Sequence, residues 1–287
     1  MKVTVLEPSG YCSGVERAMK MAIETKEKNP SKNVVVLGML VHNEDSLKVL
    51  EKHGIKTIYD KNCSLEQLID KISKPSILIL TAHGHCKAVE EKLIKNGHQI
   101  IDATCPFVNA SFKEIEKSLI KDFYVFYIGV KNHPESTAAL SISDKVLFID
   151  YKEPKIPNIA CETPLVISQT TLSELEVENI YAEIKKAYPK ANISKGICNA
   201  STSRQLALSK IPQDVDLIYV VGSVNSNNSK TLFNIANNLY PNKKVLLIQN
   251  ASEINKKDLL GLSHIAISSG ASTPKEVIEQ IKESLLN

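Results

Sequence analysis

The sequence contains an internal repeat, and each copy is marked by a cysteine at the end of a strand-like run. Cys12, Cys105 and Cys198 end the runs KVTVLEPSGYC, QIIDATC and ANISKGIC, and 93 residues separate each cysteine from the next. A helix-like apolar pattern follows each of them. Self-similarity at a fixed period is typical of a chain built from repeated structural units. The chain is therefore expected to consist of three alike units.

Each predicted unit contains about four short strands. The apolar runs VVVLG, YVFYIG and LIYVVG end at equivalent positions, and two further apolar runs follow each of them. Strands rich in Val, Ile and Leu that alternate with helical segments indicate parallel sheets covered by helices on both faces. We therefore predict an α/β protein of three pseudo-threefold-related domains, each with a small, mostly parallel sheet. The predicted domains are 13–104, 105–197, and 198–287 completed by the N-terminal strand in 1–12.

The repeated cysteines lie at the carboxyl ends of predicted strands. Ligands of parallel α/β sheets bind beyond these ends. Three alike units placed around a pseudo-threefold axis would bring their equivalent loops together at the centre, so we expect the thiols of Cys12, Cys105 and Cys198 to converge. The alternative is that the three are buried thiols whose even spacing records only a duplication.

Three convergent thiolates favour an iron–sulfur cluster. Six cysteines in 287 residues are too few for a disulfide scaffold. A structural zinc site usually takes four ligands in close Cys-x-x-Cys pairs, which this sequence lacks. A cubane cluster can use three cysteines and leave its fourth iron open for catalysis. The other cysteines break the repeat register and are expected to be buried or half-buried thiols: Cys63, Cys86 and Cys161.

Polar residues at the other strand ends indicate an anion site. Imidazoles can charge near neutral pH, and hydroxyls and amides supply directional hydrogen bonds, so such a set suits a phosphate or diphosphate. The alternative for each histidine is an ordinary core or surface position. The candidate residues are His42, His83 and His133 in the first two units, and Ser226, Asn228 and Ser272 in the third. The remaining histidines lack this placement and are interpreted as structural: His53, His85, His98 and His264.

Glu135 and Thr170 are candidates for proton delivery. Glu135 follows His133 by two residues at the predicted mouth of a strand, where a carboxyl close to a bound anion would have a raised pKa. The alternative is a solvated glutamate at a helix start. The Thr170 hydroxyl could orient a substrate hydroxyl or relay a proton, although Ser and Thr are common at strand ends.

The charge pattern indicates no particular class of partner. The formal net charge is +3, and the basic residues are mostly lysines spread along the chain, so a nucleic-acid groove is not indicated. The N-terminal apolar run is too short for a signal peptide or a membrane span, and the cytoplasm is the default location.

Arg17 and Arg204, the only arginines, each follow a repeated cysteine, which indicates a supporting role near the cluster or a coincidence.

Several segments resemble the hydroxymethylbutenyl diphosphate reductase family. They are PSGYCSGVERA, GMLVHNEDSL, TAHGH, DATCPFV, NHPES, SQTTLS, CNASTSRQ, VGSVNSNNS and SGASTP, and they extend from about Leu6 to Pro274. The resemblance implies a trefoil of three α/β domains around one 4Fe-4S cluster on Cys12, Cys105 and Cys198. It also implies reductive dehydroxylation of 4-hydroxy-3-methylbut-2-enyl diphosphate to isopentenyl and dimethylallyl diphosphate, the last step of the methylerythritol phosphate route to isoprenoids. Ferredoxin or flavodoxin would supply the electrons.

The resemblance also assigns roles to individual residues. Glu135 would be the proton donor, and Thr170 would lie near the substrate hydroxyl. Asn227 stands where the family usually has Ser, which keeps a hydrogen-bonding side chain but changes that contact. The implied diphosphate contacts are His42, His83, His133, Ser226, Asn227, Asn228 and Ser272.

Two other functions compete with this interpretation. A quinolinate-synthase-like dehydratase would also carry three cysteines on one open cluster, but its motifs are absent from the sequence. A cluster-bearing redox sensor would need no diphosphate pocket, and His42, His83 and His133 argue against it.

Overall fold

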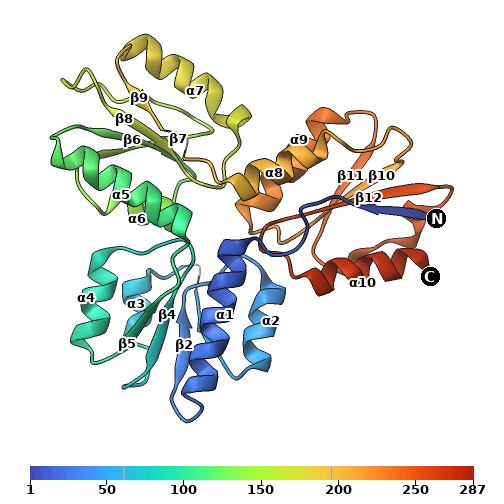
Figure 1. Ribbon diagram of the computed structural model, residues 1–287, viewed down its shortest axis with the longest axis horizontal. Helices are drawn as coiled ribbons and strands as arrows, with labels where there is room; N and C mark the ends of the chain where they lie inside the picture. Colours follow the sequence, from blue (N-terminus) through green and yellow to red (C-terminus); the bar gives the residue numbers. More distant parts are fainter. Residues whose placement is uncertain (61, 195) are drawn as a thin grey trace. The chain divides into compact units, whose positions relative to one another are not determined.

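The computed structural model describes residues 1–60, 62–194 and 196–287 (Figure 1). The chain divides into two compact units. The first unit contains Met1–Glu16, Val41–Val49 and Asn199–Asn287, and the second contains Arg17–Leu40 and Leu50–Cys198. Among the described residues, no helix combines the length and the hydrophobicity that crossing a bilayer requires.

The sheet of the first unit combines the first strand of the chain with the last three. Its order is β1 (Lys2–Val5), β12 (His264–Ser269), β10 (Leu217–Val221) and β11 (Lys244–Ile248), and all neighbouring strands are parallel. The α-helices that pack on this sheet are α8 (Asn199–Leu208), α9 (Asn227–Leu239) and α10 (Lys275–Leu286), and two short 3-10 helices follow β11, η1 (Ala251–Glu253) and η2 (Lys256–Leu259). Ile218 and Val220 pack with α8 and α9, whereas Tyr219 packs with α10. Successive side chains of β10 point to opposite faces of the sheet, and helices cover both of these faces.

One sheet of the second unit follows the first repeated cysteine in sequence. Its order is β3 (Lys56–Ile58), β2 (Val34–Leu37), β4 (Ile77–Leu80) and β5 (Gln99–Asp102). The helices of this part of the chain are α1 (Ser13–Lys28), α2 (Glu44–Lys52), α3 (Leu65–Ile69) and α4 (Lys87–Lys95). Leu37 and Leu80 pack with Leu68 of α3 and Leu93 of α4, which buries one face of the sheet.

The other sheet of the second unit positions Glu135. Its order is β7 (Val146–Asp150), β6 (Val125–Gly129), β8 (Leu165–Ser168) and β9 (Asn192–Ile193), and its helices are α5 (Pro106–Ile120), α6 (Pro134–Leu140) and α7 (Glu174–Ala187). Figure 1 shows α7 on one face and α5 with α6 on the other. Phe126 and Ile128 pack against α7, whereas Val125 and Tyr127 pack against α5 and α6. Tyr127 therefore points toward the helix that carries Glu135.

The α/β class with three small parallel sheets is confirmed. Every strand pair within the described residues is parallel. The helix predicted after Cys105 spans Pro106–Ile120 as expected, because Pro106 suits a first helical turn. The strand run ANISKGIC forms a ladder only at Asn192–Ile193, and its Lys195 lies outside the described residues. The pseudo-threefold arrangement and the domain boundaries stay predictions.

Candidate active site

The three repeated cysteines share one local geometry. Cys12, Cys105 and Cys198 each lie between the carboxyl end of a strand and the first residue of a helix, α1, α5 or α8. Each backbone N–H donates to a carbonyl in the loop that follows the neighbouring strand of the same sheet, β12, β4 or β8. The acceptors are the carbonyl oxygens of Ala271, Ala82 and Thr170, respectively, each at an N···O distance of 3.0 Å. Neighbouring strands therefore hold each cysteine in the same way.

The thiols outside the repeat differ in their surroundings. All six cysteines lie in the described part of the chain, are half-buried, and form no disulfide. Cys63 and Cys86 pack against the core cluster of α3 and α4. The Cys86 Sγ atom donates to Glu66 Oε1 at 3.0 Å, and burial, followed by this hydrogen bond, raises the pKa of the Cys86 thiol. The prediction that these are half-buried thiols is confirmed.

Both arginines contact the backbone beside a repeated cysteine. Arg17 donates to the carbonyl of Thr104, the residue before Cys105, at 3.1 Å. Arg204 is buried and donates to the carbonyl of Gly10, two residues before Cys12, at 2.7 Å. Each contact lies within one unit. Each guanidinium group therefore supports the loop of a different cysteine from the one that it follows in sequence.

The Glu135 carboxyl is fully buried and accepts three hydrogen bonds. Thr170 donates its backbone N–H to Oε1 and its Oγ1 hydroxyl to Oε2, both at 2.8 Å. The Tyr127 hydroxyl donates to Oε1 at 3.2 Å. Burial outweighs these bonds and raises the pKa of Glu135 from 4.5 to about 7. The alternative of a solvated glutamate is therefore wrong, and the group can hold or release a proton near neutral pH.

The turn between β6 and α6 places Glu135 at this position. Asn132 adopts a left-handed conformation with φ of 61°, which Asn tolerates better than most residues. His133 caps α6, because its Nδ1 atom accepts the Glu135 backbone N–H at 3.2 Å. A Cβ atom on Gly129 would lie 2.5 Å from Ser136 Oγ, so glycine is needed where α6 approaches the end of β6.

Thr170 joins Glu135 to a repeated cysteine. Its N–H and hydroxyl bind the Glu135 carboxyl, while its carbonyl accepts the Cys198 N–H. The preceding Gln169 is fully buried, accepts the Val130 N–H at 2.9 Å, and donates to Thr171 Oγ1 at 2.7 Å. The loop after β8 is therefore fixed on both sides of Thr170.

Two of the predicted anion-binding histidines lie side by side in the second unit. His83 follows β4, His133 precedes α6, and their ring centroids are 5.2 Å apart with the planes at 80°. His133 Nδ1 accepts the Glu135 backbone N–H, so Nε2 is the ring atom that can donate to a ligand. Two imidazoles thus lie next to the turn that carries Glu135.

Known proteins resemble this chain along nearly its whole length. A family model described as LytB protein matches residues 3–286. The chain belongs to this family. Among its LytB relatives is the 4-hydroxy-3-methylbut-2-enyl diphosphate reductase of Malacoplasma penetrans, 35% identical over 282 residues that cover 96% of this chain and 93% of the relative. The reductase of the same name from Bacillus cereus (strain B4264) is 35% identical over 287 residues, 98% of this chain and 89% of the relative.

Two solved structures of diphosphate reductases have the same fold as this chain. The E-1-hydroxy-2-methyl-but-2-enyl-4-diphosphate reductase of Plasmodium falciparum superposes with a TM-score of 0.86 at 28% identity, covering 100% of this chain and 88% of that one. A structure described as (E)-4-hydroxy-3-methyl-but-2-enyl diphosphate reductase, the terminal enzyme of the non-mevalonate pathway, gives a TM-score of 0.69 at 29% identity and covers 100% and 99%. The family resemblance of the motifs is therefore confirmed.

The remaining predicted LytB site residues lie in the first unit, around the start of α9. Ser226 caps this helix, with its Oγ accepting the Ser229 N–H, and Asn227 is its first residue. Buried Asn228 accepts the Ala271 N–H at 2.9 Å and donates to Ser201 Oγ at 3.1 Å. The Asn228 side chain thus fixes the loop beside Ser272 and the start of α8.

Ser272 and His42 meet in the same unit. The Ser272 hydroxyl donates to the His42 carbonyl at 3.4 Å, and Ser46 Oγ donates to the Ser272 carbonyl at 3.2 Å. Burial, partly opposed by Glu44, lowers the pKa of His42. This differs from the expectation of a ring that charges near neutral pH, and it favours a neutral hydrogen-bonding imidazole.

Contacts inside each unit thus assemble two groups of the predicted LytB residues. The group in the second unit contains His83, His133, Glu135 and Thr170. The group in the first unit lies on contacting loops and helix starts and contains His42, Ser226, Asn228 and Ser272. The convergence of these groups and of the three thiols stays a prediction. Sequence reasoning missed Tyr127, because a tyrosine within the apolar run VFYIG looks like any other core residue of a strand.

Proposed function

We propose that the chain is a 4-hydroxy-3-methylbut-2-enyl diphosphate reductase of the isoprenoid pathway. Two electrons and two protons replace the allylic hydroxyl by hydrogen, so that water leaves and isopentenyl or dimethylallyl diphosphate forms. Membership of the LytB family and the activity named for its relatives support this substrate. The observation that carries the proposal is the contact of Thr170 with both the buried Glu135 carboxyl and the Cys198 backbone.

Cys12, Cys105 and Cys198 are proposed as the ligands of one 4Fe-4S cluster with an open fourth iron. The donor set fits such a group, because three half-buried thiols share one strand-end geometry and stand at helix N-termini. Arg17 and Arg204 support the loops of Cys105 and Cys12 through backbone carbonyls. When bound, the cluster supplies electrons one at a time and a Lewis-acidic iron, and ferredoxin or flavodoxin reduces it.

Glu135 is the proposed proton donor for loss of the hydroxyl. A carboxyl whose pKa is about 7 is partly protonated at neutral pH, and its burial keeps bulk water from competing for the proton. The proton passes from the carboxyl to the leaving oxygen as the C–O bond breaks. The Thr170 hydroxyl, 2.8 Å from Glu135 Oε2, orients the carboxyl and the substrate hydroxyl.

The diphosphate is proposed to bind through neutral donors rather than through a cluster of lysines. Imidazole, hydroxyl and amide groups give directional hydrogen bonds to phosphate oxygens. The start of α9 adds backbone N–H groups and the positive end of a helix dipole. The proposed contacts are His42, His83, His133, Ser226, Asn227, Asn228 and Ser272. We place the enzyme in the cytoplasm, where such substrates and electron donors occur.

The test begins with anaerobic reconstitution using iron and sulfide, followed by the diphosphate substrate and a reductant. The expected result is isopentenyl and dimethylallyl diphosphate, with a change in the cluster spectrum on binding. Absence of both would refute the function. Replacement of Cys12, Cys105 or Cys198 by Ser should lower bound iron, whereas Ser at the matched half-buried thiols should leave it intact. The matched thiols are Cys63, Cys86 and Cys161.

A further inference from the structure

Tyr127 is a buried phenol that donates a hydrogen bond to the Glu135 carboxyl. The residue lies on β6 and is fully buried, in an apolar cluster with Ile115 of α5, Ala139 of α6 and Val146 of β7. A buried tyrosine hydroxyl needs a hydrogen-bond partner, and here Oη donates to Glu135 Oε1 at 3.2 Å. The proposed mechanism assigns no role to this side chain.

The two oxygens of the Glu135 carboxyl accept different numbers of hydrogen bonds. Oε1 accepts two hydrogen bonds, from Tyr127 Oη and from the Thr170 backbone N–H. Among the residues that the structure describes, Oε2 meets the Thr170 hydroxyl alone, which can accept as well as donate. While Oε1 accepts both bonds, a proton on the carboxyl resides on Oε2. The proton therefore lies on the side of the Thr170 hydroxyl.

We propose that Tyr127 is a positioning residue for Glu135, which holds Oε1 so that the transferable proton sits on Oε2 beside Thr170. The effect of Tyr127 on turnover rests on the proposed proton-donor role of Glu135. The position of the proton on Oε2 rests on the hydrogen bonds of the carboxyl alone.

The inference predicts a direction for the pKa of Glu135. A hydrogen bond from a neutral phenol stabilises the carboxylate more than the acid, so loss of the hydroxyl raises the pKa of Glu135 above about 7. Burial and the nearby Glu135 raise the pKa of Tyr127 itself, which keeps the phenol protonated as a donor. The groups that face the carboxyl are Tyr127 of β6 and Thr170 of the loop after β8, while His133 binds the Glu135 backbone. The cluster residues from α5 and β7 are uncharged.

The chain offers a matched control for this hydroxyl. Tyr219 is also fully buried on a central strand, β10, and packs in an apolar cluster with α10. Within the described residues its hydroxyl has no hydrogen-bond partner. Tyr127→Phe and Tyr219→Phe therefore both remove a buried tyrosine hydroxyl, and only the first of these hydroxyls is hydrogen-bonded to Glu135.

The experiment is an infrared pH titration of the reconstituted holoenzyme. The carboxylic acid band that disappears in Glu135→Gln is assigned to Glu135, and its midpoint is followed in both tyrosine variants. We expect Tyr127→Phe to move the midpoint upward by about 1 pH unit, and Tyr219→Phe to leave it in place. An unchanged midpoint in Tyr127→Phe, or an equal shift in both variants, would overturn the role of Tyr127.

Turnover of the same variants separates the two parts of the inference. If the protonated Glu135 is the donor, activity falls as pH rises through its pKa, so Tyr127→Phe extends activity to higher pH by the same shift. In a Glu135→Gln background, Tyr127→Phe should change neither the pH profile nor the residual rate. A shifted infrared midpoint with an unshifted activity profile would keep Tyr127 as the residue that positions the carboxyl and refute Glu135 as proton donor.

Discussion

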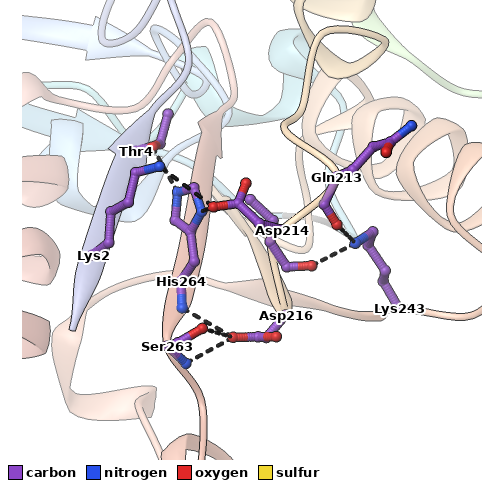
Figure 2. A network of polar contacts seen from close by, with 9 residues as sticks. Lys2, Thr4, Gln213, Asp214, Asp216, Lys243, Ser263 and His264 are labelled. Atoms are coloured by element: carbon purple, nitrogen blue, oxygen red, sulfur yellow. Dashed lines mark hydrogen bonds and ion pairs between the residues drawn. The ribbon is translucent and has the colours of Figure 1, made fainter.

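Glu135 and Asp216 accept hydrogen bonds of the same kinds, yet their pKa values move in opposite directions. Glu135 accepts one backbone N–H and two hydroxyls. Asp216 Oδ2 accepts the N–H and the hydroxyl of Ser263 at 2.7 and 3.0 Å and the N–H of His264 at 2.9 Å, as Figure 2 shows. The backbone bonds, followed by the serine hydroxyl, lower the pKa of Asp216. Burial raises that of Glu135 to about 7.

The difference between the two carboxyls is their access to water. Asp216 is exposed, so its hydrogen bonds add to good solvation and favour the charged form. Glu135 is fully buried, and the free-energy cost of removing its charge from water exceeds the stabilisation of the carboxylate by its three hydrogen bonds. Their positions also differ, because Glu135 lies beyond the carboxyl end of β6 and Asp216 just before the amino end of β10. Ligands of parallel sheets bind at the carboxyl ends.

The polar network around Asp216 fixes strands to one another. Figure 2 shows His264 between Asp214, whose Oδ2 lies 2.9 Å from Nδ1, and Thr4, whose Oγ1 lies 2.8 Å from Nε2. His264 is almost completely buried, and Lys2 forms an exposed ion pair with Asp214. The contacts connect β1 with β12 and with the segment before β10. This agrees with the interpretation of His264 as structural.

The largest expected effect comes from replacing the Glu135 carboxyl by an amide. Glu135→Gln removes the proposed proton donor and should lower turnover by about 10²- to 10⁴-fold, with iron content and substrate binding retained. Asp216→Asn makes the same chemical change at the exposed carboxyl and should leave turnover unchanged. Single-turnover rates and iron assays on both variants test this. Equal losses in the two variants would show that the comparison does not separate catalysis from structure.

The second effect is on stability as a function of pH. The pKa of Glu135 is raised in the folded state, so below about pH 4.5 both states are protonated and burial of the carboxyl adds no charge penalty. As pH rises toward 7, the unfolded state loses the proton first and stability falls. The full shift corresponds to about 3 kcal/mol. Chemical unfolding at pH 5 and pH 8 should show most of this loss in the wild-type protein and a much smaller one in Glu135→Gln.

The sequence predicted the parts of this comparison that depend on local pattern. Strand-to-helix boundaries at the repeated cysteines follow from apolar periodicity, and the NHPES motif identified Glu135 as a candidate acid. The contact of Tyr127 with Glu135 could not be predicted, because it depends on how closely α6 packs on β6. The lowered pKa of His42 has the same origin, since its burial arises from packing rather than from its neighbours in sequence.

A smaller effect is expected at the buried histidine of the structural network. Thr4→Val keeps the shape of the side chain on β1 but removes the partner of His264 Nε2. We expect the free energy of unfolding to fall by about 1 kcal/mol, the usual contribution of one hydrogen bond, with turnover unchanged. Thermal or chemical unfolding of the holoenzyme measures the first quantity. A loss of turnover would mean that the amino ends of these strands influence the site, contrary to the separation of the two carboxyls.

The smallest effect is expected for Asp216, and its pH dependence should be opposite to that of Glu135. A carboxyl whose pKa is lowered in the folded state stabilises the protein above its unfolded pKa, and this contribution is lost as pH falls through the folded pKa. Asp216→Asn should therefore be slightly less stable than the wild type at pH 7, and the difference should vanish in acid. Unfolding measured at pH 7 and near pH 3 tests the sign. A difference that grows in acid would contradict the lowered pKa, and with it the claim that solvent access decides which of two similarly bonded carboxyls holds its proton.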